Sequence, residues 1–460
     1  MKAILRKKQR RNPMKISKIL SVTLASFSAF TMSALTGFAY SGTQTGDTLT
    51  DGTFSYELRD GSYTIVGCNV DALVEEIPEL RNGYAITAID DKALSNCANI
   101  KTLTIPDTVT SIGDNAFAGC TSLKEIRLPK KIKNIGQGLF MGCTKLEKVD
   151  IPDSVNTIES YAFYNCSLLK EVALPGELSI IEPMAFAECS SIENIDASQC
   201  SSYVFEDDFL MNSEKTSICR ASAKLTGDVY IPDGITRIEA GAFSVCAGIE
   251  NLFIPSSVEY IGEDAFGYCV ALKKIDFSEG LKTIADIAFK NCPNLETLDF
   301  PTTLVEIGSG AFYSCSSLTR AVIPEGTQTI GEGAFVNCSQ LKNVSIPKSV
   351  ESVGANAFGY SFDAEGNYSL EDDFSLSVFS GSAGADYAKD SDVEFSYVDK
   401  NLKSLAFIII AVALIAAAVI FAVVLMARSR KGAPASAKKA ERLAKEKEAE
   451  ENYKKIIDNE

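Results

Sequence analysis

The chain has 460 residues, a formal net charge of −16, no histidine, no tryptophan and 13 cysteines. The absence of histidine excludes Ser-His-Asp and Cys-His nucleophilic systems, zinc sites with imidazole ligands and histidine-based pH switches. An enzyme built from this sequence would have to use carboxylates, Lys, Tyr or Cys.

The first 39 residues are typical of a secretory signal peptide. Residues 1–18 carry eight basic residues and no acidic one, residues 19–35 are apolar, and Gly37 and Ala39 are small residues at −3 and −1 of a cleavage site. Met14 is an alternative start that leaves a more ordinary basic region. The competing interpretation is an uncleaved anchor, but the apolar run is short and diluted by Ser and Thr.

A repeat of 23 residues runs through the middle of the chain. Ten cysteines mark it, at Cys97, Cys120, Cys143, Cys166 and Cys189, and again at Cys246, Cys269, Cys292, Cys315 and Cys338. The two series are separated by 57 residues, which is two repeats and 11 further residues. In nine units Phe stands three residues and Ile eight residues before the cysteine, and an apolar pair usually follows six and eight residues after it.

This periodicity predicts a solenoid, because a single unit cannot bury its apolar residues whereas stacked units bury each position against its equivalent. In the unit that begins at Leu123, the sequence Ile126-Arg127-Leu128 alternates apolar and polar residues, which predicts a short strand with one face inward. Pro129 ends that strand because it cannot donate to a ladder. Neighbouring strands are expected to pair in parallel about 4.8 Å apart and form one gently curved sheet.

Units such as Leu123-x-x-Ile126-x-Leu128-Pro129 resemble the BspA-like leucine-rich repeats of bacterial surface proteins. The resemblance covers residues 82–358. It implies a repeat solenoid in the form of a right-handed leucine-rich-repeat superhelix, with a parallel β-sheet on the concave face. It also implies exposure on the cell surface and a role in adhesion or host contact, and it carries no catalytic motif.

The same resemblance extends to the irregular and terminal parts of the repeat region. Residues 198–232 look like a longer unit that is common in the family. Residues 40–81 look like its N-terminal β cap, and residues 359–398 look like its C-terminal cap. Asp60-Gly61 and Asn82-Gly83 are typical hairpin turns.

Residues 405–426 predict one transmembrane helix, because this uncharged aliphatic run is long enough to span about 30 Å of hydrocarbon. Arg428, Arg430 and Lys431 follow it, which indicates a cytoplasmic end. Residues 427–460 would then form a charged cytoplasmic tail. Its Glu441 and Lys445, four residues apart, are typical of a solvated helix, and a cytoplasmic partner would bind there.

The predicted exterior is strongly acidic. Residues 40–404 contain 26 basic and 53 acidic residues, a net charge of −27. Such a surface repels nucleic acid and anionic lipid, so no nucleic-acid partner is expected.

The ten phased cysteines are expected to be buried reduced thiols beside Phe. A spacing of about 4.8 Å between stacked Cα atoms would permit disulfides, but equivalent side chains point in the same direction. Cys68, Cys200 and Cys219 lie outside this column, and a Cys200–Cys219 disulfide stays open. No CxxC spacing and no EF-hand pattern occurs, so neither a metal site nor a cofactor is expected.

Positions five and seven after each cysteine should face the concave surface. In the first half of the repeats these positions alternate in charge, as in Glu125, Lys148 and Glu171, which indicates a self-neutralising face. The second half places apolar residues among charged ones, a composition typical of interface hot spots. The candidate binding residues are Phe253, Lys274, Asp276, Asp299, Arg320 and Val322.

Together these features favour a membrane-anchored surface protein that binds an extracellular protein or glycan. The alternative is a sensor ectodomain that signals through its single helix to a cytoplasmic partner. No catalytic residue is predicted, because no motif places two carboxylates across a cleft, and the chain is not expected to be an enzyme.

Overall fold

The computed structural model describes residues 48–362, 367–399, 412–423, 439 and 441–448. The expected signal peptide at residues 1–39 lies outside the described residues. The chain divides into a unit that ends at Ser396 and a second unit from Tyr397 onward. The repeats belong to the first unit.

The first unit begins with a small sheet in which β3 pairs with β2 in antiparallel and with β5 in parallel fashion. Two-residue turns connect β2 to β3 and β4 to β5, at Asp60-Gly61 and Asn82-Gly83. All four turn residues have positive φ, between 46° and 84°, which suits Asn, Asp and Gly in hairpins. The strands are β1 (Leu49–Thr50), β2 (Phe54–Arg59), β3 (Ser62–Cys68), β4 (Leu80–Arg81) and β5 (Tyr84–Ile89).

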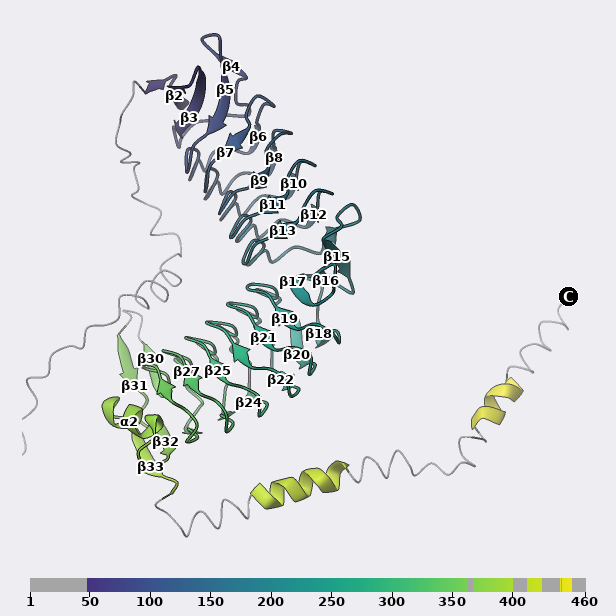
Figure 1. The fold of residues 1–460 in the computed structure, drawn as a ribbon, viewed down its shortest axis with the longest axis vertical. Coiled ribbons are helices and arrows are strands. Elements are labelled where there is room, and N and C mark those ends of the chain that lie inside the picture. Colours follow the sequence, from purple (N-terminus) through teal and green to yellow (C-terminus); the bar gives the residue numbers. More distant parts are fainter. Residues whose placement is uncertain (1–47, 363–366, 400–411, 424–438, 440, 449–460) are drawn as a thin grey trace, which may run out of the picture. The chain divides into compact units, whose positions relative to one another are not determined.

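Each repeat then contributes two short strands, which form two parallel ladders. In the main ladder each strand pairs with its equivalent 23 residues further on, as in Glu125 opposite Lys148, and its middle residue is buried. The minor ladder consists of two-residue strands, with Ile135 opposite Ile158 as an example. Figure 1 shows the two ladders on separate faces of the repeats. The sequence predicts the main ladder, whereas the minor ladder is seen only in the structure.

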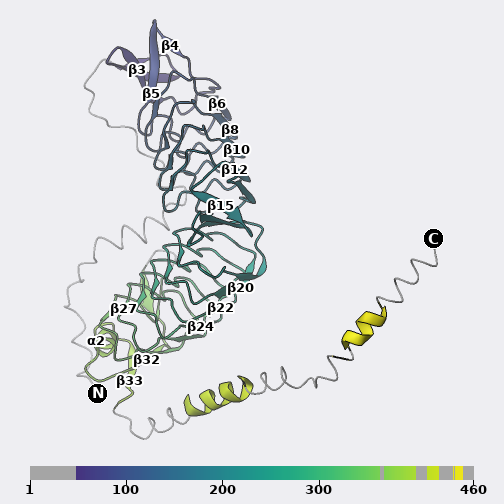
Figure 2. The ribbon, with the colours of Figure 1, turned by 45° about the vertical axis from the view of Figure 1, so that its right-hand side comes forward.

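We call the repeats before the irregular unit the N-terminal stack, and Figure 2 shows their strands β6, β8, β10 and β12 in succession. Its main ladder comprises β6 (Thr102–Thr104), β8 (Glu125–Arg127), β10 (Lys148–Asp150), β12 (Glu171–Ala173) and β14 (Asn194–Asp196). Its minor ladder comprises β7 (Ser111–Ile112), β9 (Asn134–Ile135), β11 (Thr157–Ile158) and β13 (Ile180–Ile181).

The irregular unit is an antiparallel meander of β15 (Tyr203–Glu206), β16 (Phe209–Asn212) and β17 (Ser217–Ala221). β17 pairs in parallel with β19 and so starts the second minor ladder. The prediction that all repeats form one continuous sheet is therefore wrong. The main ladder is hydrogen-bonded in segments, and the meander occupies the position between β14 and β18 where two of these segments separate.

The repeats after the meander form the C-terminal stack. Its main ladder comprises β18 (Gly227–Tyr230), β20 (Ile249–Ile254), β22 (Lys274–Phe277), β24 (Thr297–Asp299), β26 (Arg320–Val322) and β28 (Asn343–Ser345). Its minor ladder comprises β19 (Arg237–Ile238), β21 (Tyr260–Ile261), β23 (Thr283–Ile284), β25 (Glu306–Ile307), β27 (Thr329–Ile330) and β29 (Ser352–Val353).

The C-terminal stack ends in a different structure that covers its last repeat. β28 pairs with β32, which is the centre of a three-stranded sheet with β33. Helix α2 begins after Ser382, whose hydroxyl accepts a hydrogen bond from the backbone N–H of Ala385. The elements are β30 (Tyr360–Phe362), β31 (Tyr368–Leu370), β32 (Ser375–Val378), α2 (Ala383–Asp390) and β33 (Glu394–Tyr397).

The core is built around a column of phenylalanine rings, one from each repeat after the first, where Leu94 takes this position. From Phe117 to Phe186 successive rings stack with centroids 5.2 to 5.7 Å apart. From Phe243 to Phe358 they stack again, 4.6 to 5.3 Å apart. Such stacking adds to the free energy of burial and fixes the phase of the repeats.

The phased cysteines pack beside this column as free buried thiols, as the sequence predicts. Most of these thiols donate a hydrogen bond to the carbonyl of the residue 26 positions earlier, over 3.0 to 3.4 Å. In Cys143 this acceptor is Phe117. Cys200 and Cys219 are half-buried free thiols, so no disulfide joins them.

We expect alkylation of the native protein to label Cys68 first and to leave the ten column thiols unmodified. A hydrogen bond from Cys97 lowers the pKa of Cys68, whereas burial raises the pKa of Cys143 well above its usual range. Burial also raises the pKa of Cys219 to about 12, so this thiol should react slowly. Mass spectrometry of native and denatured samples measures each site, and rapid labelling of the column would contradict the packing.

In the second unit, residues 412–423 and 441–448 are helical. Lys445 pairs with Glu441 over 3.2 Å, as the spacing predicts. Among the described residues, no helix is both long and apolar enough to cross a membrane. The expected span at residues 405–426 is described only in its central part.

Candidate functional site

All six predicted binding residues lie on β20, β22, β24 and β26 of one sheet. Phe253 is opposite Asp276, and Asp299 is opposite Val322. Arg320 is opposite Thr297, which in turn is opposite Lys274. The 23-residue phase therefore brings residues from four repeats onto one face of the main ladder.

Phe253 is half-buried because it stacks on an aromatic residue that the sequence reasoning missed. Its ring lies 4.3 Å from that of Tyr230, with an angle of 7° between the planes. Tyr230 remains 62% exposed, so the pair presents a large apolar surface to solvent. Tyr230 stands 23 residues before Phe253, and this phase was the signal that could have identified it.

A shallow hollow of about 400 Å³ adjoins the aromatic pair. It is bounded by β18, β20 and β22 and by the turns that follow them. The residues that line it include Tyr230, Pro232, Phe253, Pro255, Asp276 and Ser278. Both rings and the two carboxylates of Asp233 and Asp276 line this hollow.

Charged residues occupy the other side of the surface. Arg320 binds Asp299 through two contacts, Nη2 to Oδ1 at 2.6 Å and Nη1 to Oδ2 at 3.1 Å. Both side chains are more than half exposed, so this bidentate pair fixes the orientation of the two side chains but contributes little to the stability of the fold. Val322 is 44% exposed beside them. We call the face formed by Tyr230 and the six predicted residues the aromatic face.

The N-terminal stack presents a different main ladder. Lys148 pairs with Asp150 of its own strand over 2.9 Å, and Arg127 lies 3.9 Å from Asp107. The outward positions there carry Thr, Asn, Ala and charged residues rather than aromatic ones. This polar face matches the self-neutralising surface that the sequence predicts.

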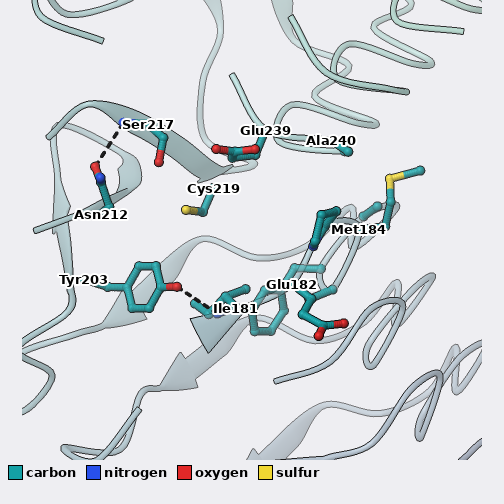
Figure 3. Close-up of a pocket in the computed structure, with 14 residues that line it drawn as sticks. Ile181, Glu182, Met184, Tyr203, Asn212, Ser217, Cys219, Glu239 and Ala240 are labelled. Atoms are coloured by element: carbon teal, nitrogen blue, oxygen red, sulfur yellow. Dashed lines mark hydrogen bonds between the residues drawn. The ribbon is translucent and has the colours of Figure 1, made fainter. Parts of the chain in front are cut away.

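A second hollow, of about 200 Å³, lies between the N-terminal stack and the meander (Figure 3). The hydroxyl of Tyr203 accepts a hydrogen bond from the backbone N–H of Ile181 over 2.8 Å. Asn212 accepts one from the backbone N–H of Ser217 over 3.0 Å. Burial raises the pKa of Tyr203 to about 12. These hydrogen bonds hold the meander in place, so we assign a structural role to the residues that line this hollow.

Within the part of the chain that the structure describes, no group of three or more Cys, Asp or Glu residues is placed to hold a metal ion. The aromatic face contains no buried nucleophile beside a base. Exposed aromatic rings and an Arg–carboxylate pair on one face have the composition that is typical of protein interfaces.

Comparison with known proteins gives consistent results. Residues 87–216 and 231–364 match the BspA type leucine rich repeat region, in six copies. The chain is similar to a leucine rich cell surface protein from Faecalibacterium prausnitzii, at 28% identity and a TM-score of 0.51, over 66% of this chain and 95% of that one. No curated protein matches the sequence.

The fold is also similar to that of the pneumococcal vaccine antigen PcpA. The TM-score is 0.56 at 17% identity, and the alignment covers 77% of this chain and 99% of that one. At this identity the likeness concerns the fold alone. The gap between the two matched ranges, residues 217–230, falls at the end of the irregular unit.

Proposed function

Because the chain belongs to the BspA-type leucine-rich-repeat family, we propose that it is a cell-surface protein whose aromatic face binds an extracellular protein or glycan. We further propose that residues 405–426 anchor it in the membrane and that residues 427–460 are cytoplasmic. The uncharged run and its basic flank support this topology. The membrane would then hold the repeats at the surface, where they act in adhesion or host contact.

The stacked pair of Tyr230 and Phe253 is the observation that carries the binding proposal. The fold does not require aromatic residues at these outward positions, because the equivalent positions of the N-terminal stack hold Thr104 and Arg127. Exposed aromatic area on the same sheet face as a bidentate Arg–carboxylate pair is a composition typical of protein-binding hot spots. These features favour a protein surface as the ligand over a free sugar.

Replacing Tyr230 and Phe253 together by Ala should weaken partner binding at least tenfold, since hot-spot residues contribute about 2 kcal/mol or more each. The measurement is retention of solubilised host-cell surface glycoproteins on the immobilised protein, at two salt concentrations and before and after enzymatic removal of glycans. Loss of binding after glycan removal would identify a glycan ligand instead of a protein.

The matched control replaces Thr104 and Arg127, which have the same phase in the N-terminal stack. This control should bind as well as the unmodified protein. Binding that survives the Tyr230 and Phe253 double substitution, or that falls equally in the control, would contradict the assignment of the aromatic face.

A further inference from the structure

A buried lysine and a buried aspartate meet in the C-terminal stack, away from the aromatic face. Lys290 and Asp264 come from successive repeats, and Lys290 Nζ lies 3.1 Å from Asp264 Oδ1. The two side chains are 5% and 0% exposed. Gly267 makes room for them, because a Cβ there would lie 1.8 Å from Asp264 Oδ1 and 3.1 Å from Lys290 Cε.

A second carboxylate approaches the same amine from the N-terminal stack. Glu188 Oε1 lies 4.0 Å from Lys290 Nζ, and the Glu188 side chain is 19% exposed. The ring of Tyr268 lies over the amine, with its centroid 5.1 Å from Nζ. Burial, together with the adjacent Glu188, raises the pKa of Tyr164, so that ring stays neutral. The Lys290 amine and the Asp264 carboxyl group are therefore shielded from water, whereas Glu188 remains partly exposed.

The charges in this cluster are unbalanced, because several carboxyl groups face one amine. Burial is the main cause that raises the pKa of Asp264 to about 7, and Glu188 and Glu263 raise it further while Lys290 opposes them. Glu263 is itself partly buried, and burial with the nearby Asp286 raises its pKa. Burial and the neighbouring carboxylates thus favour the protonated form of Asp264.

The contact also differs from a fully satisfied buried ion pair. Neither carboxylate oxygen of Asp264 accepts a hydrogen bond of good geometry from the described residues. A buried ion pair is normally stabilised by hydrogen bonds to its remaining oxygens. Here the Lys290 amine lies 3.1 Å from one oxygen of the Asp264 carboxyl group, and a second carboxylate, that of Glu188, lies 4.0 Å from the same amine.

We propose that Lys290 and Asp264 condense to a side-chain amide cross-link, with Glu188 as the proton acceptor. Glu188 takes one proton from the Lys290 ammonium, and the amine nitrogen attacks Cγ of protonated Asp264. The C–N bond forms, one C–O bond of the carboxyl group breaks, and its hydroxyl leaves as water with a second proton from the nitrogen. Glu188 then returns its proton to solvent. No oxidant or co-reactant is needed.

The cross-link joins two neighbouring repeats and closes a loop of 26 residues. Closing a loop of this size restricts the unfolded chain and so stabilises the folded one. Because Glu188 is contributed by the N-terminal stack, the reaction requires both stacks to be folded and packed together. The amide would therefore form only in a correctly assembled solenoid. Once formed, it would oppose the separation of the two repeats that it joins.

Peptide mapping of the folded full-length protein tests the proposal. We expect a branched peptide that joins the segments around Asp264 and Lys290, with a mass lower by one water than the sum of the two. The exposed pairs Lys273–Glu250 and Lys282–Glu259, at 2.6 and 2.8 Å, serve as internal controls and should give linear peptides. Linear, unmodified peptides at Asp264 and Lys290 would overturn the proposal, even if every variant failed to fold.

Two variants assign the roles. Lys290→Arg keeps the positive charge but removes the nucleophilic amine, so the branched peptide should disappear while circular dichroism stays that of the unmodified protein. Glu188→Gln keeps the shape but removes the proton acceptor, so the linear form should accumulate. A Glu188→Gln protein that cross-links as completely and as fast as the unmodified one would overturn the role of Glu188.

Discussion

Arg220→Ala should destabilise the protein by about 3–5 kcal/mol and uncouple the two stacks, because charged hydrogen bonds to buried groups are costly to remove. Arg220 is only 1% exposed. Its Nη2 donates to the carbonyl of Cys189 over 2.7 Å, at the end of the N-terminal stack. Its Nη1 donates to the carbonyls of Gly241 and Ser244 over 3.2 and 3.1 Å, in the C-terminal stack.

One guanidinium thus links three carbonyls from the two stacks. Those of Cys189 and Gly241 also accept backbone hydrogen bonds, from Ile192 over 3.5 Å and from Ser244 over 3.2 Å. The stack before the meander and the stack after it each lose a hydrogen-bonding partner when Arg220 is removed. In a solenoid, stability is approximately a sum of repeat energies and nearest-neighbour interface energies. When one interface is weakened, the repeats on either side of it can therefore unfold in separate transitions. Urea denaturation of Arg220→Ala should therefore show two transitions, with faster proteolysis in the meander.

Arg127→Ala is the matched control, because Arg127 is exposed and lies 3.9 Å from its nearest carboxylate. Its effect should stay within about 0.5 kcal/mol. Arg220→Lys should fall between the two, because an ammonium cannot reach carbonyls on both sides. A single transition of Arg220→Ala at the midpoint of the unmodified protein would show that the meander itself couples the stacks.

The regular part of the fold could be predicted because a strict period places equivalent residues on one another. The phase alone puts Phe253 opposite Asp276 and Asp299 opposite Val322, before any coordinate is known. The minor ladder could not be predicted in the same way. Strands such as Asn134–Ile135 contain two residues, and two residues carry no alternation from which a strand is recognised.

The buried polar residues could not be predicted either. Arg220, Asp264 and Lys290 are residue types that normally lie at the surface, and no periodic feature distinguishes them. Their burial follows from contacts across the irregular unit, as when Glu188 approaches Lys290 over more than four repeat lengths of sequence. The 57-residue gap, which departs from the 23-residue spacing, identifies where such contacts arise, but not which side chains make them.

Phe289→Ala should cost about 3–5 kcal/mol, the range for removing a buried aromatic side chain. Its ring is fully buried and lies 5.0 Å from that of Phe266 and 5.3 Å from that of Phe312. The substitution removes two stacking contacts and an edge contact with Phe277, and it leaves a cavity in the middle of the C-terminal stack. Chemical denaturation of the full-length protein measures the loss, and Phe289→Leu should recover part of it by filling the cavity.

A ring at the end of a column, compared with a ring in its middle, isolates the contribution of stacking. Phe186 stacks on Phe163 at 5.2 Å, and the next ring column begins at Phe243, against which Phe209 of the meander is tilted by 55°. Phe186 therefore has a stacked ring on only one side among the described residues. Phe186→Ala should cost less than Phe289→Ala, by about 0.5–1.5 kcal/mol for each of the two ring contacts that Phe186 lacks, one stacked and one edge-on. Equal losses at the two positions would mean that burial, and not the stacking of rings from one repeat to the next, holds the column together.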